Sequence, residues 1–120
     1  MKVLLADDHR IVREGLKSLL AAQPDMQVVA EASDGRQAVE MARELAPDVV
    51  VMDVAMPQLN GIEATRQIRT AHPEVEVILL STYSEADLPA DARDCGSLAY
   101  VHKEDFGPAL VRELWERAHS

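Results

Sequence analysis

Short apolar runs rich in β-branched residues recur along the chain, and amphipathic stretches separate them. Each run has the length of a β-strand. The runs at 49–52 and 77–80 are apolar throughout, as is typical of parallel strands that are buried on both faces. Strands that alternate with helices indicate an α/β domain with a parallel sheet. The predicted strands are residues 2–6, 27–30, 49–52, 75–80 and 98–101.

The stretches between these strands carry apolar residues at the spacing of three and four that marks one face of a helix. We therefore predict five helices, which right-handed crossovers distribute over both faces of the sheet. Asp34 followed by Gln37 resembles a capping box at the start of the second helix. The fourth helix, within 84–95, should be short or irregular, because Pro89 removes a backbone hydrogen bond near its start. The predicted inner faces of the other four are Val12, Leu16, Leu19 and Leu20; Ala38, Val39, Ala42 and Leu45; Ile62, Thr65 and Ile68; and Phe106, Leu110, Val111, Leu114 and Trp115.

The composition narrows the class of protein. A chain of 120 residues is about one domain and can bury a core without disulfides, and its single cysteine, Cys95, suits a reducing cytoplasm. The N-terminal apolar run is too short for a signal peptide, and no apolar stretch approaches the roughly twenty residues of a membrane span. A formal net charge of −9 argues against direct binding of nucleic acid, because phosphate backbones repel an acidic surface.

Three acidic residues stand where two predicted strands end. Asp7 and Asp8 follow the first strand, and Asp53 follows the third. If those strands are parallel neighbours, their carboxyl ends bring the three carboxylates into one crevice, where ligands bind in sheets of this type. Clustered carboxylates repel one another unless a cation or a lysine joins them, so the cluster favours a divalent metal site. Each acid alone could equally end a strand or cap a helix. We expect His9 at the exposed rim of the site and not among the metal ligands.

Polar residues also end the fourth and fifth strands, and four short motifs surround these strand ends. The motifs are Leu5-Ala6-Asp7-Asp8-His9; Asp53-Val54-Ala55-Met56-Pro57 leading to Asn60-Gly61; Leu80-Ser81-Thr82; and Tyr100-Val101-His102-Lys103. Each motif alone is weak, but their order and spacing cover the whole chain. Together they resemble the receiver domain of bacterial two-component response regulators. The resemblance implies a single receiver domain over residues 1–120, with a flavodoxin-like, doubly wound sheet of five parallel strands in the order 2-1-3-4-5 and five helices.

The resemblance also implies roles for the acidic residues. Asp53 would accept a phosphoryl group from a sensor histidine kinase. The chain would then be a signalling phosphoacceptor that catalyses only its own phosphorylation and dephosphorylation. Asp8 and Asp53 would hold Mg²⁺ directly. Asp7 would hold it through water, and the backbone carbonyl of Ala55 would complete the protein ligands, a set of oxygens that suits this ion.

By the same resemblance, three further residues would turn phosphorylation into a signal. Lys103 would pair with Asp53 before phosphorylation and with the phosphate afterwards, and Ser81 would hydrogen-bond a phosphate oxygen. The inward movement of Ser81 would let Tyr100 rotate and so change the face formed by the fourth helix, the fifth strand and the fifth helix. That face would control a downstream protein target or an output domain, and in the family it often forms a homodimer.

Two features refine the resemblance. Glu104 stands where many receivers have a proline, so we expect a trans peptide bond after Lys103. Together with the Asp-Asp-His start, this departure points toward the NarL/LuxR-type subfamily, whose members often carry a C-terminal DNA-binding helix-turn-helix. The sequence ends with the last predicted helix and contains no such module, so we expect either a stand-alone receiver or a receiver without its output domain, and we favour the first.

Other function classes fit the sequence less well. A receiver-like module that binds proteins without being phosphorylated is the main alternative, and the intact set of predicted site residues argues against it. A flavodoxin needs a Ser/Thr/Gly-rich phosphate loop after the first strand, where this chain has Asp7-Asp8-His9-Arg10. A phosphatase of the haloacid dehalogenase type needs a second Asp two residues after its nucleophile. This chain has Ala55 two residues after Asp53 and His9 two residues after Asp7.

Overall fold

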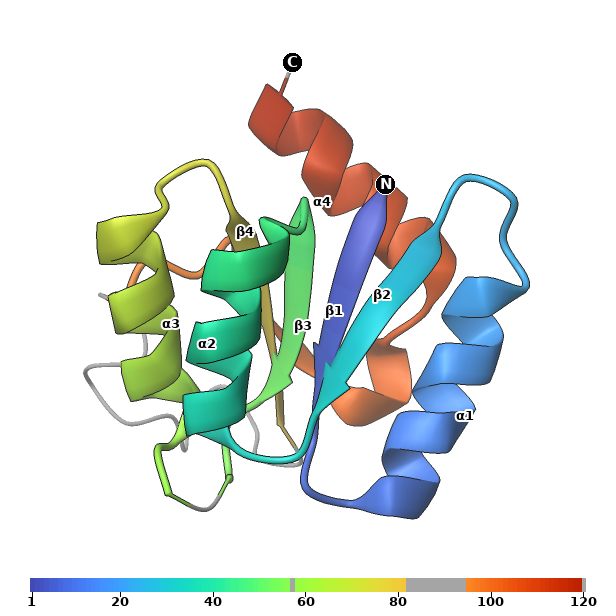
Figure 1. Cartoon of the computed structure of the whole chain (residues 1–120). Coiled ribbons are helices and arrows are strands. Elements are labelled where there is room, and N and C mark those ends of the chain that lie inside the picture. Colours follow the sequence, from blue (N-terminus) through green and yellow to red (C-terminus); the bar gives the residue numbers. More distant parts are fainter. Residues whose placement is uncertain (57, 82–94, 120) are drawn as a thin grey trace.

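The computed structural model describes residues 1–56, 58–81 and 95–119. These residues form a five-stranded parallel sheet in the order β2-β1-β3-β4-β5, flanked by four α-helices (Figure 1). The strands are β1 (Lys2–Ala6), β2 (Gln27–Ala32), β3 (Val49–Asp53), β4 (Glu76–Ser81) and β5 (Ala99–His102). The helices are α1 (Arg10–Ala21), α2 (Gly35–Leu45), α3 (Gly61–Ala71) and α4 (Pro108–His119), with a 3-10 turn at Lys103–Asp105. The predicted fold class and strand order are confirmed.

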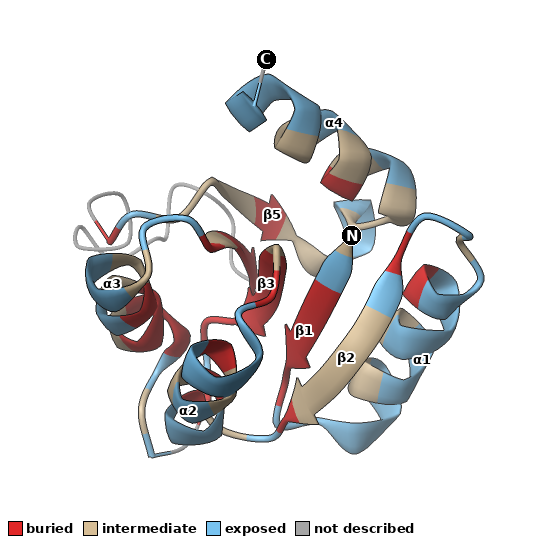
Figure 2. Ribbon diagram, turned by 45° about the horizontal axis from the view of Figure 1, so that its top comes forward, coloured by how far each residue is buried: buried red, intermediate tan, exposed pale blue. Residues whose placement is uncertain are grey.

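Side chains that alternate along the strands divide the core into two layers. On β1, Leu4 packs in the cluster that includes Ala38 of α2, whereas Leu5 packs with Leu20 of α1 and Val111 of α4. The helices α2 and α3 therefore cover one face of the sheet, and α1 and α4 cover the other (Figure 1). Every residue of β3 is buried, and Figure 2 shows the buried residues concentrated in the central strands. This burial explains why β3 is apolar from Val49 to Met52, before Asp53 ends the strand.

The predicted inner faces of α1 and α2 are wider than the buried ones. Leu20 is buried and Leu16 packs against the core, but Val12 and Leu19 are 38% and 50% exposed. Leu45, on the last turn of α2, is 40% exposed. α1 lies over β1 and β2 at the edge of the sheet, so apolar residues turned away from these two strands remain open to solvent. The spacing of apolar residues alone cannot separate these two groups.

The last helix begins later than its apolar pattern predicts. Phe106 lies before α4, which starts at Pro108 and follows a 3-10 turn at Lys103–Asp105. Proline suits the first turn of a helix, because its fixed φ is helical and the missing N–H has no partner there. Phe106 nevertheless packs against the core layer next to α4, so its prediction as an inward-facing residue is correct and its place in the helix is wrong.

Side-chain caps begin two of the helices. The Asp34 carboxylate accepts a hydrogen bond from the backbone N–H of Gln37 at 2.8 Å, as predicted. The Gln37 side chain returns to the backbone N–H of Ser33 at 3.0 Å instead of that of Asp34, so the second half of the capping box is shifted by one residue. At α3, Asn60 accepts a hydrogen bond from the backbone N–H of Glu63 at 2.9 Å. This cap fixes the start of α3 next to the end of β3.

The predicted fourth helix, within 84–95, lies outside the described residues except for Cys95, which is buried. The prediction of five helices is therefore tested only for the other four, which are all present. None of the helices in the described parts of the chain is both long enough and apolar enough to cross a membrane.

Candidate functional site

The carboxyl ends of four strands gather the predicted site residues at one edge of the sheet. Asp53 is the last residue of β3, and Asp7 directly follows β1, which is hydrogen-bonded to β3. Ser81 ends β4 on the other side of β3, and Lys103 directly follows β5. Because these strands are parallel and adjacent in the sheet, their ends lie at the same edge. This is where ligands bind in open α/β sheets.

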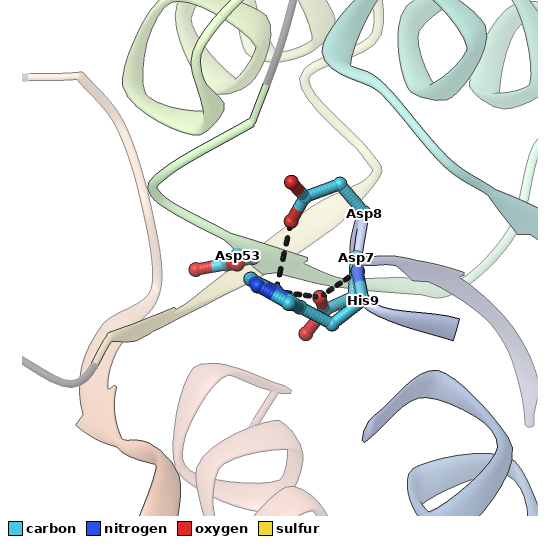
Figure 3. Close-up of side chains that lie close together, drawn as sticks. All are labelled: Asp7, Asp8, His9 and Asp53. Carbon is cyan, nitrogen blue, oxygen red and sulfur yellow. Dashed lines mark hydrogen bonds and ion pairs between the residues drawn. The ribbon is translucent and has the colours of Figure 1, made fainter. Parts of the chain in front are cut away.

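The acidic residues form a cluster able to bind a metal ion. Asp7 and Asp53 are 2% and 4% exposed, whereas Asp8 is exposed. One oxygen of each carboxylate and one ring nitrogen of His9 lie within 4.8 Å of one another. Figure 3 shows these four side chains close together. Bonds from a divalent cation to its ligands are about 2.0–2.6 Å long, so a single ion can contact atoms spaced in this way. Three of the four side chains offer oxygen, the ligand that Mg²⁺ prefers.

The ammonium group of Lys103 joins the two buried carboxylates. Its Nζ atom lies 3.1 Å from Oδ2 of Asp7 and 3.2 Å from Oδ2 of Asp53. The contact with Asp53 was expected from the sequence, and the contact with Asp7 was not. Burial opposes the charge on Lys103, but the hydrogen bonds and negative charges of both aspartates outweigh it and raise the lysine pKa. Lys103 thus supplies part of the positive charge that this carboxylate cluster requires.

Burial raises the pKa of Asp53 above its ordinary value, and the charge of Asp7 adds to the effect, although Lys103 opposes it. A carboxyl group whose pKa is higher in the folded than in the unfolded protein binds protons more tightly when folded. Ionised Asp53 therefore opposes folding, and stability falls as the pH rises from below 3.8 through the folded-state pKa. The site is built at a cost in stability that a bound cation can offset.

Asp53→Asn is expected to stabilise the protein at neutral pH by about 1 kcal/mol, the ordinary size of a single-residue effect. The reason is that the amide removes a buried negative charge beside Asp7. The gain should shrink below pH 3.8, where the wild-type carboxyl is protonated in both states. Urea unfolding of both proteins at neutral and acid pH measures the difference. A variant that is less stable than wild type at neutral pH would contradict the assignment of Asp53 as a destabilising charge.

Arg13 supports the loop between β1 and α1 that carries Asp7 and Asp8, and the sequence did not predict this role. Its Nη1 atom donates a hydrogen bond to the backbone carbonyl of Asp7 at 2.7 Å, and its Nε atom donates to Glu31 at 3.3 Å. Glu31, on β2, also accepts a hydrogen bond from Lys17 at 3.1 Å. Within the loop, the backbone N–H of His9 donates to Oδ1 of Asp7 at 2.8 Å. The only signal in the sequence was a basic residue one turn into the helix that follows the acids.

The loop after β3 contacts Asp53 closely. The backbone N–H of Ala55 donates a hydrogen bond to Oδ1 of Asp53 at 3.3 Å, so Ala55 lies beside the carboxylate. Gly61 donates from its backbone N–H to the carbonyl of Val54 at 2.8 Å. A Cβ atom on Gly61 would lie 2.2 Å from the backbone carbonyl oxygen of Asp53. Only glycine fits at this point, where the start of α3 meets the end of β3.

The remaining predicted residues occupy neighbouring strands. Ser81 is buried at the end of β4, next to the end of β3. Tyr100 lies on β5, partly buried, and packs against the core layer shared with α2 and α3. No cis peptide bond occurs in the described segments, so the bond from Lys103 to Glu104 is trans, as expected.

A cavity of about 260 Å³ lies elsewhere, beside α2 and the loop before α3. Its lining residues are Arg36, Val39, Glu40, Gln58, Leu59 and Gln67. None of the acidic-cluster residues lines it, so the cavity and the candidate site are separate features of the fold.

Sequence comparison relates the chain to one group of known proteins. The sequence profile of the response regulator receiver domain matches residues 3–114. The transcriptional regulatory protein DegU of Brevibacillus brevis is 38% identical over 114 residues, and LiaR of Bacillus subtilis (strain 168) is 44% identical over 103 residues. These alignments cover 95% and 86% of this chain but 48% and 49% of the two relatives. The chain thus spans about half the length of the curated relatives it matches.

Solved structures agree with the sequence comparison. The NarL signal receiver domain of Mycobacterium tuberculosis matches with a TM-score of 0.88 at 28% identity, covering 99% of this chain and 96% of the other. The response regulator domain of CheB from Thermotoga maritima matches with a TM-score of 0.86 at 34% identity, covering 100% and 97%. A DNA-binding response regulator of the LuxR family from Staphylococcus aureus matches with a TM-score of 0.86 at 27% identity, covering 99% and 98%. The resemblance to NarL/LuxR-type regulators is confirmed, and the chain belongs to the receiver-domain family of two-component response regulators.

Proposed function

We propose that residues 1–120 are a single receiver domain that accepts a phosphoryl group from a sensor histidine kinase onto Asp53. The observation that carries this proposal is the buried carboxylate of Asp53, which lies at a strand end between a metal-competent acidic cluster and the ammonium group of Lys103. In the transfer, an oxygen of Asp53 bonds to phosphorus while the bond from phosphorus to the kinase imidazole nitrogen breaks. The product is an acyl phosphate at Asp53.

The donor set fits Mg²⁺. Asp8 and Asp53 would hold the ion directly, Asp7 would hold it through water, and the backbone carbonyl of Ala55 would complete the protein ligands. When bound, Mg²⁺ supplies positive charge that offsets the carboxylates and the phosphoryl oxygens. Lys103 provides further positive charge from the protein itself, because its Nζ atom already lies within 3.2 Å of Asp53.

Ser81 and Tyr100 would report the modification. Ser81, at the end of the strand next to Asp53, would donate its hydroxyl hydrogen to a phosphate oxygen. Its movement would let Tyr100 change position on β5 and so alter the face around β5 and α4. The acceptance of one charged group at Asp53 would in this way reach a surface that a partner can read.

The expected output is a protein contact. We assign to the chain no turnover of a diffusible substrate, only its own phosphorylation and dephosphorylation. In the cytoplasm, its partners would be a sensor histidine kinase and a downstream protein target or output domain, and the face around β5 and α4 would support a homodimer. The chain itself would not bind nucleic acid directly, since its net charge is −9. A receiver-like module that works without phosphorylation remains the alternative.

Phosphorylation by a small donor separates the two functions. The chain is incubated with acetyl phosphate and Mg²⁺, and intact-protein mass spectrometry measures the product. We expect one phosphoryl addition to the wild type, none after Mg²⁺ is chelated, and none in Asp53→Asn. Because the amide lacks the nucleophilic oxygen anion, the variant cannot form an acyl phosphate. Equal labelling of the variant would remove Asp53 from its role, and an unlabelled wild type would favour the phosphorylation-independent module.

A further inference from the structure

We propose that His9 supplies a nitrogen ligand to the metal site, so that the site discriminates between Mg²⁺ and transition-metal cations such as Co²⁺, Cu²⁺ and Zn²⁺. This inference rests on the proposed function, because it concerns the same acidic cluster. It reverses the expectation from the sequence that His9 lies at the rim without touching the metal. The site would hold Mg²⁺ through oxygens and would bind the softer ions through oxygens and imidazole together.

The position of the His9 ring is the main evidence. Its Nδ1 atom lies 3.0 Å from Oδ1 of Asp8 and 3.3 Å from Oδ1 of Asp7. Figure 3 shows the ring between these two carboxylates. The ring is 65% exposed, so an incoming ion can reach it from solvent. A ring nitrogen of His9 is also the fourth member of the group whose ligand atoms lie within 4.8 Å of one another.

The backbone holds His9 beside the carboxylates, and the His9 side chain does not cap α1. His9 is the N-cap residue of α1, yet its side chain makes no capping hydrogen bond. Its backbone N–H donates a hydrogen bond to Oδ1 of Asp7 at 2.8 Å, which closes a tight turn and holds His9 beside the acidic residues. The imidazole therefore points at the carboxylates and does not make the capping hydrogen bond that is usual for a residue at this position.

Lys103 and His9 contact different carboxylate oxygens. The ammonium group lies against Oδ2 of Asp7 and Oδ2 of Asp53. The His9 nitrogen lies against the Oδ1 atoms of Asp7 and Asp8. A cation that binds at the Oδ1 side therefore avoids the positive charge of Lys103 and meets the imidazole. This division of the oxygens makes His9 part of the side of the cluster that is open to a metal.

A nitrogen donor changes which ions the site prefers. Mg²⁺ is a hard cation that favours oxygen ligands and keeps several waters. Imidazole suits Zn²⁺, Cu²⁺ and other first-row transition metals, whose affinity for mixed nitrogen and oxygen sites rises along the Irving–Williams order. His9 would thus raise the affinity for these ions more than the affinity for Mg²⁺. Both kinds of ion would compete for the same aspartates.

Metal titrations of the wild type and of His9→Phe test the inference. Phenylalanine keeps a ring of similar size and removes both nitrogens. Calorimetric titration gives the affinities for Co²⁺ alone and for Mg²⁺ alone, and His72→Phe serves as the control, because His72 caps the far end of α3. We expect the ratio of Co²⁺ to Mg²⁺ affinity to fall by about tenfold or more in His9→Phe, because losing even a supporting group of a metal site typically lowers metal affinity by that much. In His72→Phe the ratio should stay at the wild-type value.

A second measurement reads the ligand atoms directly. Electron paramagnetic resonance of the wild type with one equivalent of Cu²⁺ should show nitrogen hyperfine coupling, and this coupling should be lost in His9→Phe. An unchanged affinity ratio in His9→Phe, or a copper spectrum with oxygen ligands alone, would overturn the proposal. Labelling of the same wild-type sample by acetyl phosphate with Mg²⁺ is measured alongside. Its absence would contradict the proposed function, and the ratio would still decide the role of His9.

Discussion

Gly61→Ala is expected to destabilise the protein by about 3 kcal/mol and to impair phosphorylation together with folding. The added Cβ would lie 2.2 Å from the backbone oxygen of Asp53 and 3.0 Å from Cα of Val54. Both neighbours are backbone atoms, so no flexible side chain can move aside. Either the start of α3 or the end of β3 must shift, and the second shift displaces the proposed phosphoacceptor.

Gly15→Ala is the matched control for this substitution. Gly15 lies in the middle of α1 and is exposed, and a Cβ atom there would meet nothing within 4 Å apart from its chain neighbours and the backbone of its own helix. Alanine at this position should stabilise the helix by roughly 0.5–1 kcal/mol, because it has the higher helix propensity. Urea unfolding followed by circular dichroism gives both free energies. Similar stabilities for the two variants would show that the contact at Gly61 is not tight.

Lys103→Met is the second substitution with a large expected effect. It removes the ammonium group that lies within 3.2 Å of both buried aspartates and leaves their charges without this partner. Breaking a buried pair by deleting one member costs about 3 kcal/mol or more, and the partial exposure of Lys103 places the expected loss near that value. The raised pKa of Lys103 means that wild-type stabilisation is fully present at neutral pH and is lost only above 10.5.

The loss should depend on pH and on metal. As the pH falls, the aspartates of the variant become protonated, so the difference from wild type should shrink. Mg²⁺ should restore part of the stability, because it binds the folded cluster and not the unfolded chain. Lys17→Met is the control: Lys17 is half exposed and pairs with Glu31, a surface contact worth less than about 1 kcal/mol. A Lys103→Met variant as stable as Lys17→Met would contradict the proposed role of Lys103 in the cluster.

The sheet was predictable from the sequence because its central strands are continuous apolar runs. Buried parallel strands must be apolar on both faces, and the run at 49–52 meets that condition and forms most of β3 in the structure. The acidic site followed from the same pattern, since the carboxyl ends of adjacent parallel strands meet at one edge. Asp7 and Asp53 could therefore be brought together from the sequence alone.

Side-chain reach and helix exposure could not be predicted in the same way. The contact of Lys103 with Asp7 depends on how a long side chain crosses from the end of β5 to the end of β1. The bond from Arg13 to the carbonyl of Asp7 depends on the angle at which α1 leaves the loop. Val12 and Leu19 fit a helical stripe equally well whether or not another element covers them. The orientation of the His9 ring likewise has no signature in the sequence.

The most direct test of the central claim is the position of the phosphoryl group. Wild-type protein is treated with acetyl phosphate and Mg²⁺ and then with borohydride, which reduces an acyl phosphate of aspartate to homoserine, and peptide mass spectrometry locates the product. We predict homoserine at position 53, dependent on Mg²⁺, with Asp7 and Asp8 unchanged. Homoserine at Asp7 or Asp8, or a phosphorylated protein with aspartate intact at position 53, would contradict the assignment of Asp53 as the phosphoacceptor.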